Sequence, residues 1–413
     1  MCPAMSKPRL PARHRSGPVH DARRRALVLG LGASGLALSQ PGAWAHEPAL
    51  PPLPAFQETG FADSPLVGRI VGADGLALQP VQLLAQCAAA SICMLGEQHD
   101  HPDHHALQAW VIQALAARGQ LAAVALEMVD AGRRFDGPAD ASQGSAGPPQ
   151  TSLPSAEGGP VGRAWGRSQG NAGPPQVSLT PMGGGSASRA WGRSQGNAGP
   201  PQVSLTPTGG GSAGRPWGRS EASVRQALHW NDDGWPWALY VGPVMAAVRA
   251  GIPVVGVNLP DAEMMNAYRD PKWDASVPEA VRRSVIDDVR DSHCGLLPAA
   301  QLPAMARIQF ARDASMAAGC VALLQSRRTV VLLAGSFHAD KTVGIALHLA
   351  AADPVGHGAK LPGVFSLLLQ GVDGDTAPRP PSGFDAVWFT PPTPPVDHCA
   401  ALRKSLADKA GKP

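Results

Sequence analysis

Residues 93–105 read CMLGEQHDHPDHH. A short apolar run ends at Gly96, and four histidines and three acidic residues follow within nine positions. A glycine lets the backbone turn sharply after a buried strand. Polar side chains at such a turn are typical of the ligand-binding edge of an α/β sheet. The stretch therefore predicts a strand that ends in a polar loop and leads into a helix.

Apolar strands alternate with helical segments on the rest of the chain. Continuous apolar runs are typical of strands that are buried on both faces of a parallel sheet. The predicted fold class is α/β, a mostly parallel β-sheet covered by helices on both faces. The predicted strands are 91–95, 122–126, 253–257, 329–333, 364–369 and 386–389. The predicted helices are 103–117, 221–228, 240–249, two or three within 261–324, and 343–350.

The first 45 residues resemble a secretory signal. Three arginines, residues 23–25, precede an apolar run, and residues 43–45 have the A-x-A form of a cleavage site. Paired arginines leave both ordinary and twin-arginine export open. No later stretch reaches the roughly 20 apolar residues of a membrane span. We expect a periplasmic or exported protein that is soluble after signal cleavage and has no transmembrane span.

The middle of the chain contains an internal repeat. Residues 142–219 hold three copies of a 26-residue unit rich in Gly, Pro, Ser and Gln. Such a unit cannot bury enough apolar area to offset the entropy of ordering it. We expect a single domain with a disordered repeat insertion; the alternative is a binding arm that uses the Arg and Trp residues of each copy. The predicted parts are a signal (1–45), an N-terminal extension (46–84), a domain (85–390, interrupted by 142–219) and a tail (391–413).

The charge of the chain is unevenly distributed. The formal net charge is +3, but the signal contributes +6 and the repeats +5, which leaves −8 for the remainder. This remainder lacks the basic footprint of a protein that binds nucleic acid.

Five cysteines follow the signal, so at least one thiol stays unpaired. Cys294 and Cys399 are the favoured bridge in an oxidising compartment. Cys93 and Cys320 are interpreted as small buried residues.

Polar side chains follow several predicted strands. The pattern G-x-x-H occurs at 96–99 and at 335–338, each time after an apolar run. Acid–base chemistry would use a carboxylate–histidine pair, and an open metal site would use the same residue types. The alternative is that these groups only cap strands and helices. The candidate catalytic residues are Glu97, His99, Glu127 and His338, and the candidate ligands of a divalent metal are His99, His338 and Glu97.

Three more histidines lie at the start of the first predicted helix. His101 is interpreted as part of a solvated helix start, where Asp103 favours the helix dipole. His104 or His105 is expected to face the site.

A second candidate site lies at residues 230–240. Trp230, Trp235 and Trp237 precede Tyr240, one of two tyrosines in the chain. A large flat ligand needs apolar walls with a few polar groups, and a tyrosine can be an axial ligand of haem iron. Tyr268 is the other tyrosine. The alternative is that the tryptophans belong to the hydrophobic core.

Several segments resemble one family. LGEQHDHPDHHALQAWVIQAL, ALEM, WALYVGPVMAAVRAGIPVVGVNLP, ARDASMA and LLAGSFHADKTVGIALHL are similar to the ChaN-like haem-binding proteins of the Tiki superfamily, which also includes metal-dependent peptidases and erythromycin-esterase-like hydrolases. The resemblance covers most of 85–390 outside 142–219, and both G-x-x-H motifs match. It implies an α/β fold, haem binding linked to iron uptake, iron ligated by the tyrosine at position 240, and a homodimer that encloses two haems. The chain lacks the lipidation cysteine of an anchored member.

Two functions remain open at this stage. The first is haem binding, with Tyr240 on the iron and Trp230, Trp235, Trp237, His104 and His105 around the ligand. The second is hydrolysis of an ester or amide by a metal-bound or histidine-activated water at the paired G-x-x-H motifs.

Overall fold

The computed structural model describes residues 48–136, 220–352, 363–374 and 380–410. The chain divides into two units, Met1–His46 and Glu47–Pro413, and every described residue belongs to the second. The predicted signal and the 26-residue repeats lie outside the described residues.

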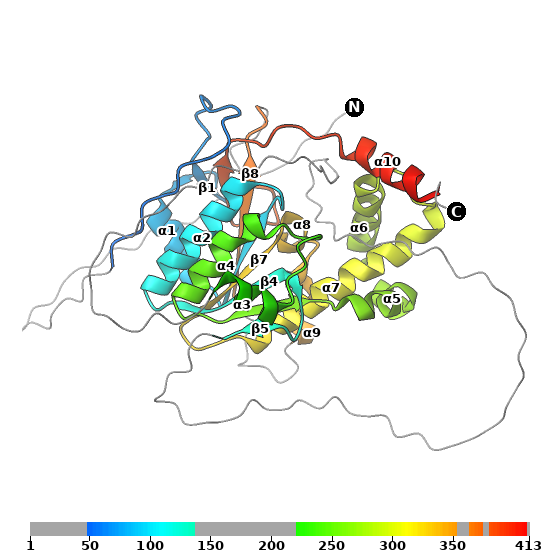
Figure 1. The fold of residues 1–413 in the computed structure, drawn as a ribbon, viewed down its shortest axis with the longest axis horizontal. Helices are drawn as coiled ribbons and strands as arrows, with labels where there is room; N and C mark the ends of the chain where they lie inside the picture. The colour runs from blue at the N-terminus through cyan, green and yellow to red at the C-terminus, as the bar shows by residue number, and fades with distance from the viewer. Residues whose placement is uncertain (1–47, 137–219, 353–362, 375–379, 411–413) are drawn as a thin grey trace, which may run out of the picture. The chain divides into compact units, whose positions relative to one another are not determined.

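A mixed sheet forms the centre of the described residues (Figure 1). Its order is β2-β1-β9-β8-β3-β7-β4-β6-β5. The inner strands from β9 to β6 are parallel, whereas β1, β2 and β5 pair antiparallel at the edges. The strands are β1 (Ile70–Gly72), β2 (Ala77–Leu78), β3 (Ile92–Glu97), β4 (Leu121–Asp130), β5 (Arg134–Phe135), β6 (Val254–Asn258), β7 (Thr329–Gly335), β8 (Val364–Gly371) and β9 (Ala386–Thr390).

Helices cover both faces of this sheet, as the sequence predicted. The helices are α1 (Pro80–Ala89), α2 (Pro102–Ala117), α3 (Glu221–Leu228), α4 (Trp237–Arg249), α5 (Asp261–Arg269), α6 (Glu279–Ser292), α7 (Leu302–Ala322), α8 (Ser336–Ala339), α9 (Leu349–Ala352) and α10 (His398–Ala410). Short 3-10 helices are η1 (Pro271–Ala275), η2 (Ala299–Gln301) and η3 (Ile345–His348). Helices α1 to α4 share one hydrophobic cluster with the sheet, and α7 and α9 share a second hydrophobic cluster with it.

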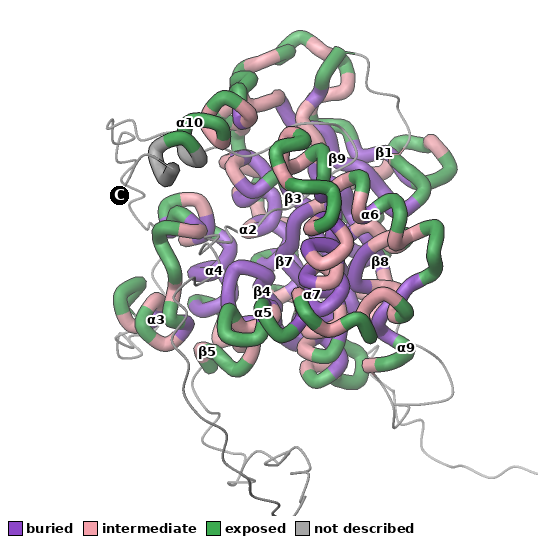
Figure 2. Tube along the Cα trace, turned by 90° about the vertical axis from the view of Figure 1, so that its right-hand side faces the viewer, coloured by how far each residue is buried: buried purple, intermediate pink, exposed green. Residues whose placement is uncertain are grey.

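The pleat of the strands decides which face each side chain reaches. Leu95 lies in the cluster under α2 and α4, and its neighbour Met94 lies in the cluster under α7. Figure 2 shows β3, β4 and β7 buried between the helices. Because the alternation continues to the carboxyl ends of the strands, it also distributes the polar side chains there.

The predicted strands are all present, and each extends further toward its carboxyl end. Strand β3 includes Glu97, β4 runs to Asp130, and β7 includes Gly335. The predicted helix at 343–350 is instead the short η3 and α9. Gly344 approaches the backbone of the preceding turn so closely that a Cβ would lie 2.2 Å from the carbonyl oxygen of His338. A regular helix therefore begins only after this glycine.

Elements outside the predicted domain limits also join the fold. Strands β1 and β2 pair with the sheet although they lie in the predicted extension, and α1 crosses residue 85. Helix α10 lies in the predicted tail. None of the described helices is long and apolar enough to cross a membrane.

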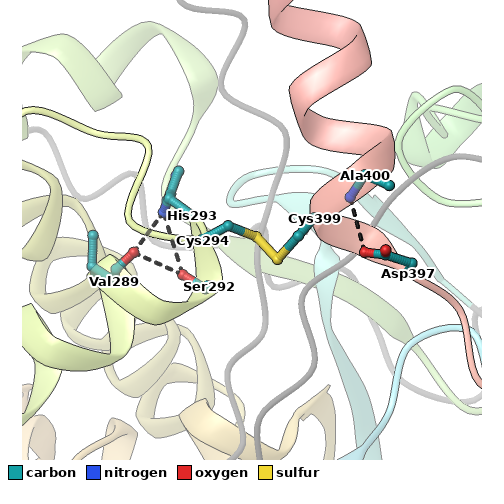
Figure 3. The surroundings of a disulfide bond; sticks show 7 residues. All are labelled: Val289, Ser292, His293, Cys294, Asp397, Cys399 and Ala400. Carbon is teal, nitrogen blue, oxygen red and sulfur yellow. Dashed lines mark hydrogen bonds between the residues drawn. A yellow bond between two sulfur atoms is a disulfide. The ribbon is translucent and has the colours of Figure 1, made fainter.

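Two disulfides stabilise the described residues. One joins Cys294, in the turn after α6, to Cys399 of α10, as the sequence favoured (Figure 3). The other joins Cys87 of α1 to Cys93 of β3; Cys93 is buried, as predicted, but it is also paired, which the sequence did not predict. Cys320 is free and buried, and burial raises the pKa of its thiol to about 12.

Candidate functional site

Two buried polar clusters lie at the carboxyl ends of the central strands. The Glu97 cluster consists of Glu97, His99, His105, Gln108 and Tyr240. The His338 cluster consists of Glu127, Arg312, Asp313, His338 and His348. Because the strands are parallel, their ends bring residues distant in sequence to one edge.

Glu97 is the acceptor at the centre of its cluster. Its Oε1 accepts hydrogen bonds from His99 Nδ1 and from the Tyr240 hydroxyl, both at 2.8 Å. Its Oε2 accepts from Gln108 Nε2 and lies 3.4 Å from His105 Nδ1. The carboxylate is 1 % exposed. A buried carboxylate with this many donors satisfies the rule that buried charge must be paired and hydrogen-bonded.

The electrostatics of this cluster favour an ion pair between Glu97 and His105. Burial alone would raise the pKa of Glu97, but the charge of His105 and the histidine hydrogen bonds outweigh it and lower this pKa. Burial alone would lower the pKa of His105, but the Glu97 charge and its hydrogen bonds raise it. His105 Nε2 donates to the His99 carbonyl at 3.0 Å, so both ring nitrogens face acceptors.

Tyr240 does not present its oxygen to a ligand. The side chain is 0 % exposed, and its hydroxyl donates to Glu97. Burial, followed by the charge of Glu97, raises the pKa of Tyr240 well above its usual value. A tyrosinate bound to iron would place a second negative charge beside this carboxylate. In this geometry Tyr240 therefore does not fit the predicted role of iron ligand.

The three predicted tryptophans pack among themselves. Trp230 lies edge-on to Trp237 with ring centroids 5.0 Å apart, and Trp235 lies edge-on to His99 at 4.7 Å. Trp235 and Trp237 are buried, and Trp230 is half-buried. Together with Tyr240 they belong to the hydrophobic cluster under α2 and α4. The aromatic residues thus fill space in the core rather than forming an open wall.

His101 and His104 are buried away from the Glu97 cluster, so the expectation of a solvated His101 was wrong. Their rings stack at 3.8 Å. His101 Nε2 donates to the Pro391 carbonyl at 2.8 Å, and His104 Nε2 lies 3.2 Å from Thr390 Oγ1. These contacts attach the start of α2 to the end of β9. Of His104 and His105, which were both candidates for the site, His105 is the one that contacts Glu97. Pro102 occupies the first turn of α2, and the rings of His101 and His104 beside it are buried.

The His338 cluster lies on the opposite face of the sheet. His338 Nδ1 lies 2.7 Å from Asp313 Oδ1, and its Nε2 lies 3.5 Å from Glu127 Oε1. Glu127 Oε2 accepts from the backbone N–H of Gly335 at 2.7 Å. Burial alone would lower the pKa of His338, but the charges of Glu127 and Asp313 raise it. His338 thus lies between two carboxylates, whose charges favour its protonated form.

Several polar atoms of this cluster make no hydrogen bond to the described residues. They are Glu127 Oε1, His338 Nε2, Asp313 Oδ2, His348 Nε2, and the Nε and Nη1 atoms of Arg312. Arg312 is 2 % exposed, and its remaining nitrogen contacts only the sulfur of Met264 at 3.9 Å. Buried polar atoms are costly without partners. Their concentration indicates a place where water or a small polar ligand is accommodated.

The predicted catalytic residues are divided between the two clusters, although the charge of Glu127 still acts on Tyr240 of the Glu97 cluster. Glu97 lies two residues after Leu95, and Glu127 lies two residues after Ala125. Because side chains two apart on a strand share a face, and Leu95 and Ala125 belong to clusters on opposite faces of the sheet, the two carboxylates point to opposite faces. His99 lies on the same side as Glu97, which it contacts, and His338 lies on the same side as Glu127, which it contacts. The predicted metal ligands His99, His338 and Glu97 are divided in the same way. No group of three or more His, Cys, Asp or Glu among the described residues has the arrangement of a metal site.

Four residues of the clusters, Gln108, Arg312, Asp313 and His348, had not been singled out. Gln108 lies one helical turn after His105, and this spacing predicts that the two side chains lie on the same face of the helix. Arg312 and Asp313 belong to the ARDASMA segment, where charged residues interrupt an apolar helix. Two adjacent charged residues inside an otherwise apolar helix are the sequence signal that could have identified them.

Comparisons with known proteins agree with the predicted resemblance. The family model described as "Haem-binding uptake, Tiki superfamily, ChaN" matches residues 83–135 and 213–349. A solved structure described as cofacial heme binding to ChaN of Campylobacter jejuni matches with 17% identity and a TM-score of 0.47. That match covers 77% of this chain and 95% of the other chain. No curated protein matches.

Proposed function

Because the chain belongs, through residues 83–135 and 213–349, to the ChaN-like haem-binding family of the Tiki superfamily, we propose that it binds haem. The family match carries this proposal. It includes strands β3, β4, β6 and β7 with their carboxyl ends, together with helices α2 to α8.

Tyr268 is the tyrosine that we assign to the iron. The chain has two tyrosines, and Tyr240 is fully buried against Glu97. Tyr268 lies on α5, which follows β6 at the same edge of the sheet, and it is half-buried. Its neighbour Met265 is 42% exposed and offers apolar surface. When haem is bound, its iron would supply the ligand-binding or redox chemistry, and this chain would supply the phenol oxygen and apolar contacts.

A titration with haemin tests this proposal. The mature protein should give a saturable change in the visible spectrum, with the features of a phenolate-ligated ferric haem. Tyr268→Phe should lose these features, and the matched Tyr240→Phe variant should keep them. No saturable change with the wild-type protein would contradict haem binding itself, and loss only in Tyr240→Phe would contradict our choice of tyrosine.

We also propose that the protein is exported and takes part in haem uptake. The support is the signal-like sequence of residues 1–45 and the uptake role in the family description. Fractionation of cells that produce the full chain should recover a shortened form outside the cytoplasm. The homodimer stays a prediction.

A hydrolase is the second candidate, and the His338 cluster favours it. Glu127 Oε1 and His338 Nε2 lie 3.5 Å apart without a mutual hydrogen bond, and Asp313 orients the ring. Such a pair can position and deprotonate a water molecule. A screen of esters and peptides should then show turnover that Glu127→Gln and His338→Ala both abolish. Both oxygens of Glu97 already accept hydrogen bonds, so Glu97→Gln should retain activity if the protein folds.

A further inference from the structure

The chain between β9 and α10 passes over the loop that carries the first G-x-x-H motif. Thr393 Oγ1 accepts a hydrogen bond from Gln98 Nε2 at 3.1 Å, and the Pro391 carbonyl accepts from His101 Nε2 at 2.8 Å. His398, the first residue of α10, is close enough to Asp100 for the two charges to interact. We name residues 391–410 the C-terminal strap. The strap thus contacts the loop at Gln98, which stays exposed, and at His101, which is buried.

Noncovalent packing holds the outer part of the strap only weakly. Residues 394–397 are exposed, and so are the described side chains at positions 400, 403, 404 and 407. Among the described residues, no side chain of α10 belongs to any of the three hydrophobic clusters. Segments with few buried apolar contacts open locally at low cost in free energy.

The disulfide holds α10 where packing does not (Figure 3). It joins the strap to Cys294, which follows α6 and is itself held by backbone hydrogen bonds of that turn. Both cysteines are half-buried, whereas the other disulfide joins two fully buried residues. A reductant in solution therefore reaches Cys294–Cys399 more easily.

We propose that the Cys294–Cys399 disulfide is a redox-sensitive clasp that keeps the C-terminal strap over the Gln98–His101 loop. A thiolate of a small dithiol attacks one sulfur and forms a mixed disulfide, and the other protein sulfur leaves as a thiolate and takes up a proton. The second thiol of the reductant then closes its own disulfide and releases the second protein thiol. Two electrons and two protons pass to the protein, the strap separates from α6, and the loop becomes accessible. The proposal concerns access to this loop and does not depend on haem being the ligand.

Amide hydrogen exchange on the mature protein tests the clasp. Cys399→Ser removes the bond without a reductant, and Cys294→Ser is an independent variant with the same expectation. We expect exchange in 97–101 and 391–404 to become at least about tenfold faster, with β4 and β7 unchanged. Treatment of the wild-type protein with a dithiol should reproduce this pattern and make Cys294 and Cys399 reactive toward a thiol label.

The matched control is Cys320→Ala, which changes a buried thiol outside the disulfides and should leave exchange in both segments unchanged. Unchanged protection of 97–101 in both serine variants would overturn the proposal, even if α10 itself exchanged faster. Loss of protection throughout β4 and β7 would also overturn it, because the bond would then stabilise the whole sheet rather than the strap.

Discussion

At the scale of single residues, the Glu97 carboxylate determines how its neighbours are used. It accepts hydrogen bonds from a histidine in the loop after β3, a glutamine of α2 and a tyrosine of α4. The Tyr240 hydroxyl points to this acceptor because an unpaired buried carboxylate would be costly. Tyr240 is therefore part of the charge network of the protein, and its chemistry cannot be separated from that of Glu97.

Tyr240→Phe should lower the free energy of unfolding by about 1–3 kcal/mol, since a buried carboxylate loses one donor. Urea denaturation of the variant and the wild-type protein measures this change. Tyr268→Phe is the control and should change stability by less than about 0.5 kcal/mol, because Tyr268 is half-buried and the substitution removes only its hydroxyl. Equal effects of the two substitutions would contradict the importance of the Glu97 hydrogen bond.

The stacked pair His101 and His104 predicts a loss of stability in mild acid. Burial lowers the pKa of His101 to about 4 and lowers that of His104 well below its usual value. The unfolded chain takes up these protons as the pH falls through 6.5, whereas the folded chain does not. The free energy of unfolding should therefore fall between pH 6.5 and 4, by about 3 kcal/mol for His101 alone.

Urea denaturation at several pH values, with wild-type protein and His101→Gln, tests this prediction. The variant should lose less stability than the wild type between pH 6.5 and 4. His105 and His338, whose pKa values are raised, change their contributions above pH 6.5 and do so in both proteins, so the difference between the proteins from pH 6.5 to 4 isolates His101. Parallel curves would show that His101 does not resist protonation.

The Glu97 and His338 clusters also show how far residue-level prediction extends. The two G-x-x-H motifs correctly indicated polar strand ends, because a glycine after an apolar run marks such an end. The partners of these residues could not be predicted, since Tyr240 lies 143 positions from Glu97 and Asp313 lies 25 positions from His338. Successive residues of a strand point to opposite faces of the sheet. Because the predicted strands ended before Glu97 and Glu127, the faces on which these two side chains lie could not be predicted.

At the scale of elements, two mid-helix glycines are used differently. A Cβ on Gly319 of α7 would lie 2.5 Å from Val257 Cγ1, whereas a Cβ on Gly242 of α4 has its nearest contact at 3.8 Å. Gly319→Ala should therefore cost about 1–3 kcal/mol through overpacking against β6. Gly242→Ala should change stability by less than about 1 kcal/mol. Thermal or urea denaturation of the two variants tests this, and equal effects would contradict the close approach of α7 to β6.

Strands and helices were predictable where one period dominates. Strands such as β6 and β7 are continuous apolar runs, and α3 has a serine cap with the residue spacing of a helix. The edge strands β1, β2 and β5 have two or three residues and no readable period. Their positions depend on pairing with β9 and β6, which is a tertiary effect.

At the scale of the whole molecule, the ends that flank the repeats lie close together. Strand β5 ends at Phe135 and contacts α3, and Arg133 Nη1 lies 3.5 Å from His229 Nε2. Deletion of 142–219 should therefore preserve the fold. It should raise the free energy of unfolding by up to about 2 kcal/mol, since a shorter loop costs less closure entropy. Calorimetry of the shortened chain measures this, and a destabilised product would show that the repeats contribute contacts.

The strand order also has a consequence for the nascent chain. Strand β3 pairs only with β7 and β8, both of which are synthesised more than two hundred residues later. During most of translation β3 is an apolar segment without a hydrogen-bonding partner among the described strands, whereas β1 can pair with β2, and β4, β5 and β6 can associate, before β7 is made. Unpaired apolar strands aggregate readily. The polypeptide should therefore depend on a holdase chaperone until residue 335 has left the ribosome.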